Sequence, residues 1–381
     1  MALTTIQSNN KLVKFRQDIT LEYFQGNQFS PYMGDSPTSI IQRINDLKAG
    51  GEQVNIPLVT QLDGDGVGTG TLVGNEENID NYGMRLWIDW ARNAVKTNKA
   101  ETQKTSADIF GKATPLLSNW GKRKQRDELI LAMHALPSAS PPAGLGSNAG
   151  QRVNGILYSA ATAAQKNTWN TANSDRVLYG NAVGNYVSGN HASSLANIDA
   201  TDDRAKASTL GLLKDIAESA NPHITPYMTE DGYEHYVLFV GSRVFRDFKA
   251  DPTIYAANRD ARAREGRGMD SNPIFQDGDL LYDGVIIRKI PQMDGLTTVA
   301  SAGASSIAVA PIFLCGQSAV GFAWGQMPRP TQLDETDYGF NKGVGVEMAY
   351  GIGKLAKVPE GGSALKDWGM VTGYLASIPN A

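Results

Sequence analysis

The sequence predicts an α+β fold in which an extended two-stranded ribbon and a long helix precede a mixed lobe. Strand-like alternation flanks a glycine-rich stretch at residues 62–83, and a helical pattern of apolar residues runs over residues 102–134. From residue 151 onward, strand and helix patterns mix without a sustained βαβ rhythm. This mixture favours an α+β fold over a doubly wound sheet.

Residues 1–51 are predicted to form an N-terminal arm. Five apolar anchors stand in an otherwise polar segment: Leu12, Phe15, Ile19, Tyr23 and Phe24. Because they have few apolar neighbours in sequence, we expect them to pack across a subunit boundary or along the long helix. The arm ends with SPTSIIQRINDLKAGG, which predicts a short helix closed by Gly50 and Gly51.

Residues 52–96 are predicted to form the ribbon, an extended loop of two strands. Apolar residues alternate with others on both sides of the glycine-rich stretch, at Val54, Ile56, Leu58, Met84, Leu86, Ile88 and Trp90. This is the period of a strand. An isolated two-stranded ribbon is marginal in water, so a ribbon this long should lie on another surface, and a second copy of the chain is a natural candidate.

The glycine-rich stretch, LDGDGVGTGTLVGNEENIDNYG, has two alternatives to a plain loop. A phosphate-binding loop would need GxGxxG after a strand or GxxxxGK followed by Ser or Thr, and neither is present. A calcium loop of the EF-hand kind would use Asp63, Asp65 and Gly68, but Val67 and Gly74 stand where two oxygen ligands belong. Repeated glycine adds conformational freedom that a fixed site would have to restrict, so we interpret the stretch as a loop.

Residues 102–134 carry the pattern of one long helix. Its apolar face comprises Ile109, Phe110, Ala113, Leu117 and Trp120, and it resumes after KRKQRDE with Leu129, Ile130 and Met133. We expect Pro115 to kink this helix. PSASPPAGLGSNAG, residues 137–150, is a loop by composition and the predicted boundary between lobes.

The rest of the chain mixes both kinds of element. Helices are predicted at residues 208–220 and 242–265, and strands at residues 236–240 and 284–290. Residues 317–381 are punctuated by glycine and rich in strand patterns, most clearly in GVGVEMAYGIGKLAKV.

Composition narrows the function. Lys plus Arg is 35 and Asp plus Glu is 39, a net charge of −4, so overall electrostatics give no case for wrapping nucleic acid. The N-terminus lacks the apolar core of a secretion signal, and the most apolar window, residues 307–324, is interrupted by Pro311 and Gly316. A single cysteine, Cys315, excludes an intrachain disulfide framework and fits a reducing compartment.

No enzyme signature is present in the sequence. The four histidines, His134, His191, His223 and His235, lack the spacing of a zinc site. His223 lies near Glu218 and Asp231 in sequence, but a structural role is the better interpretation. We therefore assign no catalytic residue, no metal and no cofactor.

The acidic end of the glycine-rich stretch is the main candidate for a contact between subunits. We expect Glu76, Glu77 and Asp80 to meet basic residues of an adjacent subunit. The first-choice partners are Arg123 and Arg126 in the long helix. The second choice is the cluster Arg259, Arg262, Arg264 and Arg267. The competing interpretation of each cluster is a solvated helix face.

The order of these parts resembles the major capsid proteins of tailed bacteriophages, which have the Hong Kong 97 fold. Four phrases also resemble one podovirus-type branch of that family: LVGNEENIDNY at residues 72–82, DRVLYG at 175–180, NPIFQDGDLLYDGVII at 272–287 and DWGMVTGYLAS at 367–377. The resemblance implies five parts: an N-terminal arm (1–51), an extended loop (52–96), the spine helix of a peripheral domain (97–136), an axial domain (137–316), and strands that return to the peripheral domain (317–381).

The resemblance also implies a structural protein, not an enzyme, assembled in the host cytoplasm into the icosahedral head of a virion. The shell would enclose packaged double-stranded DNA without sequence-specific binding and without a membrane. Implied partners are other copies in pentamers and hexamers, a portal protein, a separate scaffolding protein and, as a further candidate, a cement protein. A near-neutral to acidic chain fits containment, because a strongly basic lining would bind the packed DNA.

Two other classes stay open at this point. One is a glycine-rich hydrolase or glycan-binding protein that uses Asp63 and Asp65 with calcium, and the other is a phage tail or decoration protein. Calcium-dependent stability of the monomer would favour the first. Concentration-dependent growth into megadalton particles would favour the capsid protein.

Overall fold

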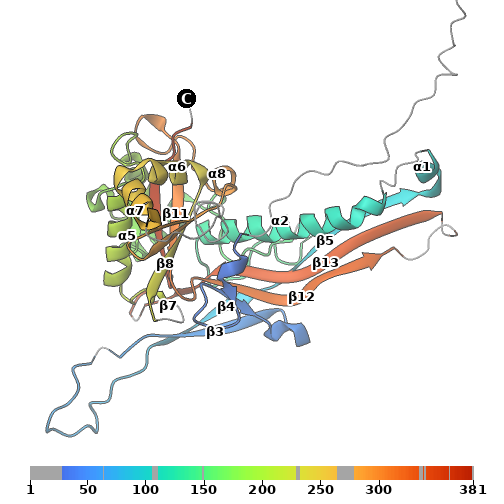
Figure 1. Cartoon of the computed structure of the whole chain (residues 1–381). Coiled ribbons are helices and arrows are strands. Elements are labelled where there is room, and N and C mark those ends of the chain that lie inside the picture. The colour runs from blue at the N-terminus through green and yellow to red at the C-terminus, as the bar shows by residue number, and fades with distance from the viewer. Residues whose placement is uncertain are drawn as a thin grey trace, which may run out of the picture.

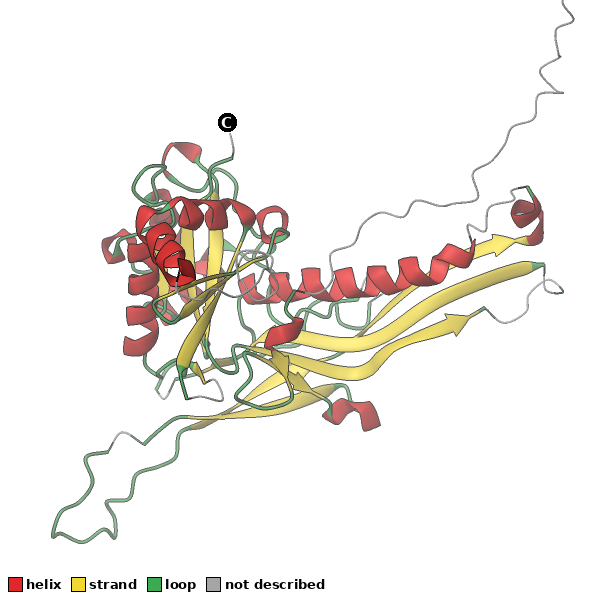
Figure 2. Cartoon of the chain, viewed as in Figure 1, coloured by secondary structure: helices red, strands yellow, loops and turns green. Residues whose placement is uncertain are grey.

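A long helix and two sheets organise the chain (Figure 1). The computed structural model describes residues 28–62, 64–104, 110–147, 150–228, 232–263, 279–333, 338, 340–359 and 361–379. One sheet lies in a compact lobe among short helices, and the other extends away from that lobe beneath the long helix α2 (Ala113–His134) (Figure 2). The ribbon projects away from the molecule on the side opposite the far end of the extended sheet (Figure 1).

The extended sheet has five strands, in the order β1 (Met33–Gly34), β2 (Ile41–Ile44), β12 (Val320–Gln332), β13 (Asn341–Lys354) and β5 (Asp89–Asn98). β12 pairs antiparallel with β13, and β13 pairs antiparallel with the whole length of β5. Segments from both ends of the sequence therefore share one sheet.

The ribbon consists of β3 (Gln53–Val59) and β4 (Asn81–Trp87), paired antiparallel in an unbroken register. Its inward side chains, including Ile56, Leu58 and Leu86, are buried in one cluster with Leu355. The predicted strands are confirmed, and the pattern that predicted them is the alternation of these apolar residues.

Helix α2 begins later than its sequence pattern suggested. A separate short helix, α1 (Lys99–Gln103), follows β5, and residues 105–109 lie outside the described ranges. Pro115 is the third residue of α2, where an amide has no intrahelical carbonyl to bond. The expected kink is therefore wrong: the proline sits in the first turn. Gly121 of α2 faces Met348 of β13, where an added Cβ would be in ordinary van der Waals contact at 3.8 Å.

The compact lobe is built on a seven-stranded sheet. Its path is β6 (Val177–Tyr179), β16 (Met370–Ala376), β11 (Val309–Cys315), β8 (Glu234–Val240), β10 (Val285–Lys289) and β9 (Leu280–Tyr282), and β7 (Tyr227–Met228) pairs with β8. The helices of the lobe are α3 (Ala163–Ala172), α4 (His191–Ala196), α5 (Ala207–Ser219), α6 (Ser242–Ala250), α7 (Pro252–Ala263) and α8 (Met293–Leu296). A small pair, β14 (Ala356–Lys357) and β15 (Lys366–Asp367), joins this lobe to the extended sheet.

Most elements predicted for the mixed lobe are confirmed. Residues 208–220 correspond to α5, residues 236–240 to β8 and residues 284–290 to β10, and the predicted helix from residue 242 is divided into α6 and α7. α7 is described as far as Ala263, so the last predicted helical residues fall outside the described chain.

Two expectations need correction. The phrase SPTSIIQRINDLKAGG forms strand β2 and a short 3-10 helix, Asp46–Ala49, in place of an α-helix, because Ile41 and Ile44 pack beside β12 in the sheet core. Residues 317–381 do not return to one sheet. β12 and β13 belong to the extended sheet, whereas β16 lies inside the seven-stranded sheet between β6 and β11.

Candidate functional site

The distal part of the ribbon presents several apolar side chains to solvent. The last ladder contact joins the Thr60 amide to the Asp80 carbonyl, and the described residues between them form neither helix nor strand. Four large apolar side chains in this distal loop are more than half exposed: Leu62, Leu72, Val73 and Ile79. Exposure of this kind on a projecting loop is typical of an interaction surface.

The base of the ribbon is held by an ion pair within the subunit. Asp80 pairs with Lys357 of β14, whose side chain is only 4% exposed, and Thr60 Oγ1 lies 3.4 Å from the same ammonium group. A pocket of about 360 Å³ lies beside this pair, between the ribbon base and the compact lobe. Within the subunit the Asp80 carboxylate already pairs with Lys357, and its contact with a neighbouring subunit stays a prediction.

A second, deeper ion pair continues this junction. Lys354 Nζ lies 2.7 Å from Asp367 Oδ2, and both side chains are at most 2% exposed. The indole of Trp169 donates to the same carboxylate at 3.3 Å, and the Asp367 amide donates to Asn173. Buried charges need this kind of complete pairing, so the junction between the two sheets is polar but satisfied.

Sequence reasoning missed both lysines. A usable signal was present, because Lys354 and Lys357 interrupt the apolar run GIGKLAKV at positions that a buried strand would fill. Lysine is seldom buried without a carboxylate partner. The partner itself had no local signal, since Asp80 lies 277 residues away.

The other predicted contact residues have different surroundings. Glu76 and Glu77 are exposed, and each accepts a hydrogen bond from a loop amide, Gly74 at 2.7 Å and Gly64 at 2.9 Å. Arg123 is exposed on α2 and stays a candidate. Arg126, one helical turn further along α2, is buried and pairs with Asp127 at 2.8 Å; its contact with a neighbouring subunit stays a prediction that this burial disfavours.

The remaining candidates cannot be placed by their side chains. Arg259 and Arg262 belong to α7, in a stretch whose side chains are not described. Five further candidates lie outside the described ranges: Phe15, Tyr23, Phe24, Arg264 and Arg267.

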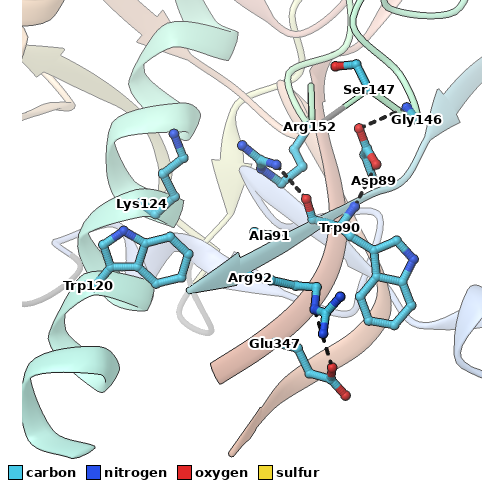
Figure 3. A pocket seen from close by; sticks show the side chains of 10 residues that line it. All are labelled: Asp89, Trp90, Ala91, Arg92, Trp120, Lys124, Gly146, Ser147, Arg152 and Glu347. Carbon is cyan, nitrogen blue, oxygen red and sulfur yellow. Dashed lines mark hydrogen bonds and ion pairs between the residues drawn. The ribbon is translucent and has the colours of Figure 1, made fainter. Parts of the chain in front are cut away.

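A groove of about 690 Å³ runs between α2 and β5 (Figure 3). Its two sides carry aromatic side chains, Trp120 on the helix and Trp90 on the strand, and Trp90 is half exposed. Lys124, Arg92 and Glu347 also line it, and Arg92 lies 3.8 Å from Glu347. No sequence pattern had marked this groove, because β5 and α2 meet Arg152 and Glu347 only in the folded chain.

The floor of the groove is fixed by Arg152. Its guanidinium donates to both carboxylate oxygens of Glu128 and to the Trp90 carbonyl, at 2.7–3.0 Å. Burial alone would lower the pKa of Arg152, but the hydrogen bond and charge of Glu128 outweigh burial and raise that pKa. The arginine therefore stays charged and ties α2 to β5.

The histidines of the compact lobe have structural surroundings. His191 contacts two tyrosine hydroxyls, Tyr158 at 2.8 Å through Nε2 and Tyr179 at 2.6 Å through Nδ1. Tyr179 donates its own proton to Asn170, so it accepts from Nδ1–H and the Nε2 atom accepts from Tyr158. Burial lowers the pKa of His191 to about 4. The ring is a neutral, fully bonded part of the core.

His223 and Cys315 have contrasting surroundings. His223 is exposed and its Nδ1 lies 2.9 Å from the Glu218 carbonyl. Cys315 is buried, and burial raises the pKa of its thiol. Within the described ranges, no group of three or more His, Cys, Asp or Glu side chains is arranged to hold a metal ion. Over the same residues, no helix has both the length and the apolar character needed to cross a membrane.

Comparison with known proteins identifies the family. A family model described as "Phage capsid protein" matches residues 3–378. A search of curated proteins found no match. Among solved structures, the capsid asymmetric unit of cyanophage Pam1 is similar at 30% identity and a TM-score of 0.83, with 100% of both chains covered.

More distant capsids share the fold alone. The capsid of Ralstonia phage GP4 is 19% identical with a TM-score of 0.71, again over 100% of both chains. The head structure of Helicobacter pylori bacteriophage KHP40 is 13% identical with a TM-score of 0.65, covering 98% of this chain and 99% of that one. The mixed α+β architecture is thus that of Hong Kong 97-like phage capsids over its full length. The chain belongs to the phage capsid protein family: it is a structural protein of the virion, not an enzyme, and its copies form the head shell.

Proposed function

We propose that this subunit builds an icosahedral shell from pentamers and hexamers around packaged double-stranded DNA, and that the ribbon reaches over an adjacent subunit. The observation that carries the proposal is the contrast along the ribbon. Its base is packed and ion-paired within the subunit, whereas its distal loop leaves Leu62, Leu72, Val73 and Ile79 exposed. Apolar side chains presented on a fixed arm are suited to bury surface on a neighbour.

The proposal also assigns a role to each part of the subunit. In this proposal the compact lobe acts as the axial domain around the capsomere centre. The extended sheet with α2 acts as the peripheral domain, and residues 1–51 act as an arm that overlaps neighbours. Heterologous contacts of this kind close into rings when the rotation permits.

Further partners belong to the proposal. A portal protein and a separate scaffolding protein would take part in assembly, and a cement protein is a further candidate. The phrases LVGNEENIDNY and DWGMVTGYLAS support placing the phage in a podovirus-type branch. The net charge of −4 supports enclosure of DNA without sequence-specific binding.

Deletion of residues 63–74 tests the role of the ribbon. The described residues among them, 64–74, make no part of either sheet, so the subunit should keep its circular dichroism spectrum and melting temperature. Particle yield by sedimentation, with the neighbouring phage genes co-expressed, should fall by at least about tenfold. The matched control replaces the same residues by a glycine-serine linker of equal length, which keeps the reach and removes the side chains. Normal yield from the deletion would contradict the proposal.

A further inference from the structure

The outer edge of β5 is open. β5 pairs with β13 along one side, and no other described strand lies on its second side. Main-chain groups alternate between the two sides of a strand. The Lys99 amide donates to the Phe340 carbonyl just before β13, so the main-chain N–H and C=O groups of odd-numbered residues in β5 point toward β13. The main-chain groups of even-numbered residues, from Trp90 to Lys96, point toward the open edge.

Side chains close this edge only in part. At Trp90 the amide donates to Asp89 Oδ1 at 2.8 Å and the carbonyl accepts from Arg152 at 2.7 Å. The Ala94 amide donates to the neighbouring Asn93 side chain at 2.9 Å. In the described chain, no side chain bonds to the main-chain N–H and C=O groups of Arg92 and Lys96, and both residues are exposed. An uncovered edge of this length is a template for another strand.

The distal ribbon offers a strand that fits. Residues 75–80 carry no helix or strand assignment, and 76–79 are exposed. Within the described residues, the main-chain N–H and C=O groups of Glu76 and Asn78 form no hydrogen bond. Glu77, between them, turns its carboxylate toward Gly64 on the other branch of the loop. In an extended strand the main-chain groups of alternate residues such as 76 and 78 lie on one side, so these unbonded groups can form a strand edge.

Charge favours the match. Arg92 and Lys96 on the edge, and Lys122 and Arg123 on the adjacent helix, are exposed and basic, whereas the ribbon segment carries Glu76. The acids near the edge are already engaged: Asp89 is buried and accepts from main-chain amides, and Glu347 faces Arg92. An acidic strand beside a basic edge gains opposite-charge cross-strand pairs.

The ribbon cannot supply this strand to its own subunit. Figure 1 shows the distal loop and the far end of β5 at opposite ends of the molecule. Resting on the proposed function, we propose that residues 75–79 of a second copy add as a strand to the open edge of β5 at residues 92–96. Main-chain hydrogen bonds provide the affinity, and Glu76 beside Arg92 or Lys96 selects the register.

Engineered disulfides test this pairing. Cβ atoms of facing residues on paired strands lie about 4.5–5.5 Å apart, which oxidation can bring into disulfide range. The only native cysteine, Cys315, is buried, so introduced thiols are reported cleanly. Ala94→Cys is combined in turn with cysteine at residues 76, 77, 78 and 79. At least one register should give a ladder of covalently linked subunits after assembly and oxidation. Single variants, and Asn78→Cys with Tyr233→Cys on the compact lobe, should give none.

Hydrogen exchange on the unmodified protein provides a second test. Amides in residues 92–96 and 75–79 should both slow by at least about tenfold on passing from free subunits to shells. Shells that form without cross-links in any register and without this protection would overturn the inference while the proposed function stands. Protection of 92–96 alone would overturn it in favour of another occupant. If the unmodified chain forms no shells with its phage partners, the proposed function fails and the inference fails with it.

Discussion

The two sheets of this subunit differ in how completely they are covered. In the compact lobe, every residue of β11 and β16 is buried, and the edge strands β6 and β9 have only three residues each. In the extended sheet, the edge strand β5 has ten residues, most of them exposed. The first sheet is finished within one chain. The second leaves hydrogen-bonding groups and apolar side chains that a shell can use, which is how a capsid subunit stays foldable and still depends on its neighbours.

The polar groups follow the same division. Inside the compact lobe and at its junction, His191, Asp367 and Lys354 have complete sets of partners. On the ribbon and along β5, charged side chains are exposed and weakly paired. Substitutions in the first group should therefore affect the subunit itself, and substitutions in the second should affect assembly.

The largest effect on the subunit is expected from Asp367→Ala. Lys354 would remain buried without its counter-charge, so the free energy of unfolding should fall by about 3–5 kcal/mol. Urea denaturation of the soluble subunit measures this. The control is Glu101→Ala, which removes a pair in which both side chains are more than half exposed and should cost less than about 1 kcal/mol. Equal costs for the two variants would contradict the comparison.

Acid should destabilise the compact lobe through His191. Its pKa is about 4 in the folded subunit, because burial disfavours the charged ring, against about 6.5 when unfolded. Stability from the neutral ring is thus present in full above pH 6.5 and is lost as the pH falls toward 4, by roughly 3 kcal/mol. His134, whose pKa is also lowered by burial, acts in the same direction.

Urea denaturation at several pH values between 7 and 4 checks this prediction. Carboxylates also titrate in this range, so the readout is the slope against pH. His191→Gln should flatten that slope, and the exposed control His223→Gln should leave it unchanged. An identical slope in all three proteins would show that the buried histidine is not the cause.

A smaller effect is expected at the ribbon base. Asp80→Asn leaves the buried Lys357 ammonium with a neutral partner, at a cost of about 1–3 kcal/mol. Because the pair holds the ribbon to β14, amide exchange should accelerate in β3 and β4 more than in β11. Asp65→Asn, on the exposed loop, is the control and should change neither. Uniform acceleration across both sheets would mean that the pair stabilises the whole subunit.

The smallest effect per subunit is expected for exposed charges. Glu76→Lys with Glu77→Lys should leave the melting temperature unchanged, since an exposed pair contributes only about 0.2–1 kcal/mol. A shell repeats each contact, so particle yield should still drop and become less sensitive to salt. Lys122→Glu with Arg123→Glu should partly restore yield in the same chain. Unchanged yield after the first reversal, measured by sedimentation across a salt series, would indicate that the acidic end is only solvated.

The sequence by itself determined the kinds of element and their order. The alternation at Ile56, Leu58 and Leu86, the helical face ending at Met133 and the apolar run of β8 are local patterns, and each formed the predicted element. Local patterns suffice here because the period of apolar residues reports which face of an element is buried. They failed at Ile41, where pairing with β12 outweighed a helical pattern.

Only the tertiary structure decided which groups meet. It joined Asp80 to Lys357, turned Arg126 inward, set Trp90 across from Trp120, and left the edge of β5 without a neighbour. These outcomes depend on how two sheets and α2 are placed relative to one another, and that placement joins residues hundreds of positions apart. A charge carries no local sign of its distant partner, whereas an apolar period carries its own. For this reason the fold could be predicted from the sequence, and the partners at the candidate contact site could not.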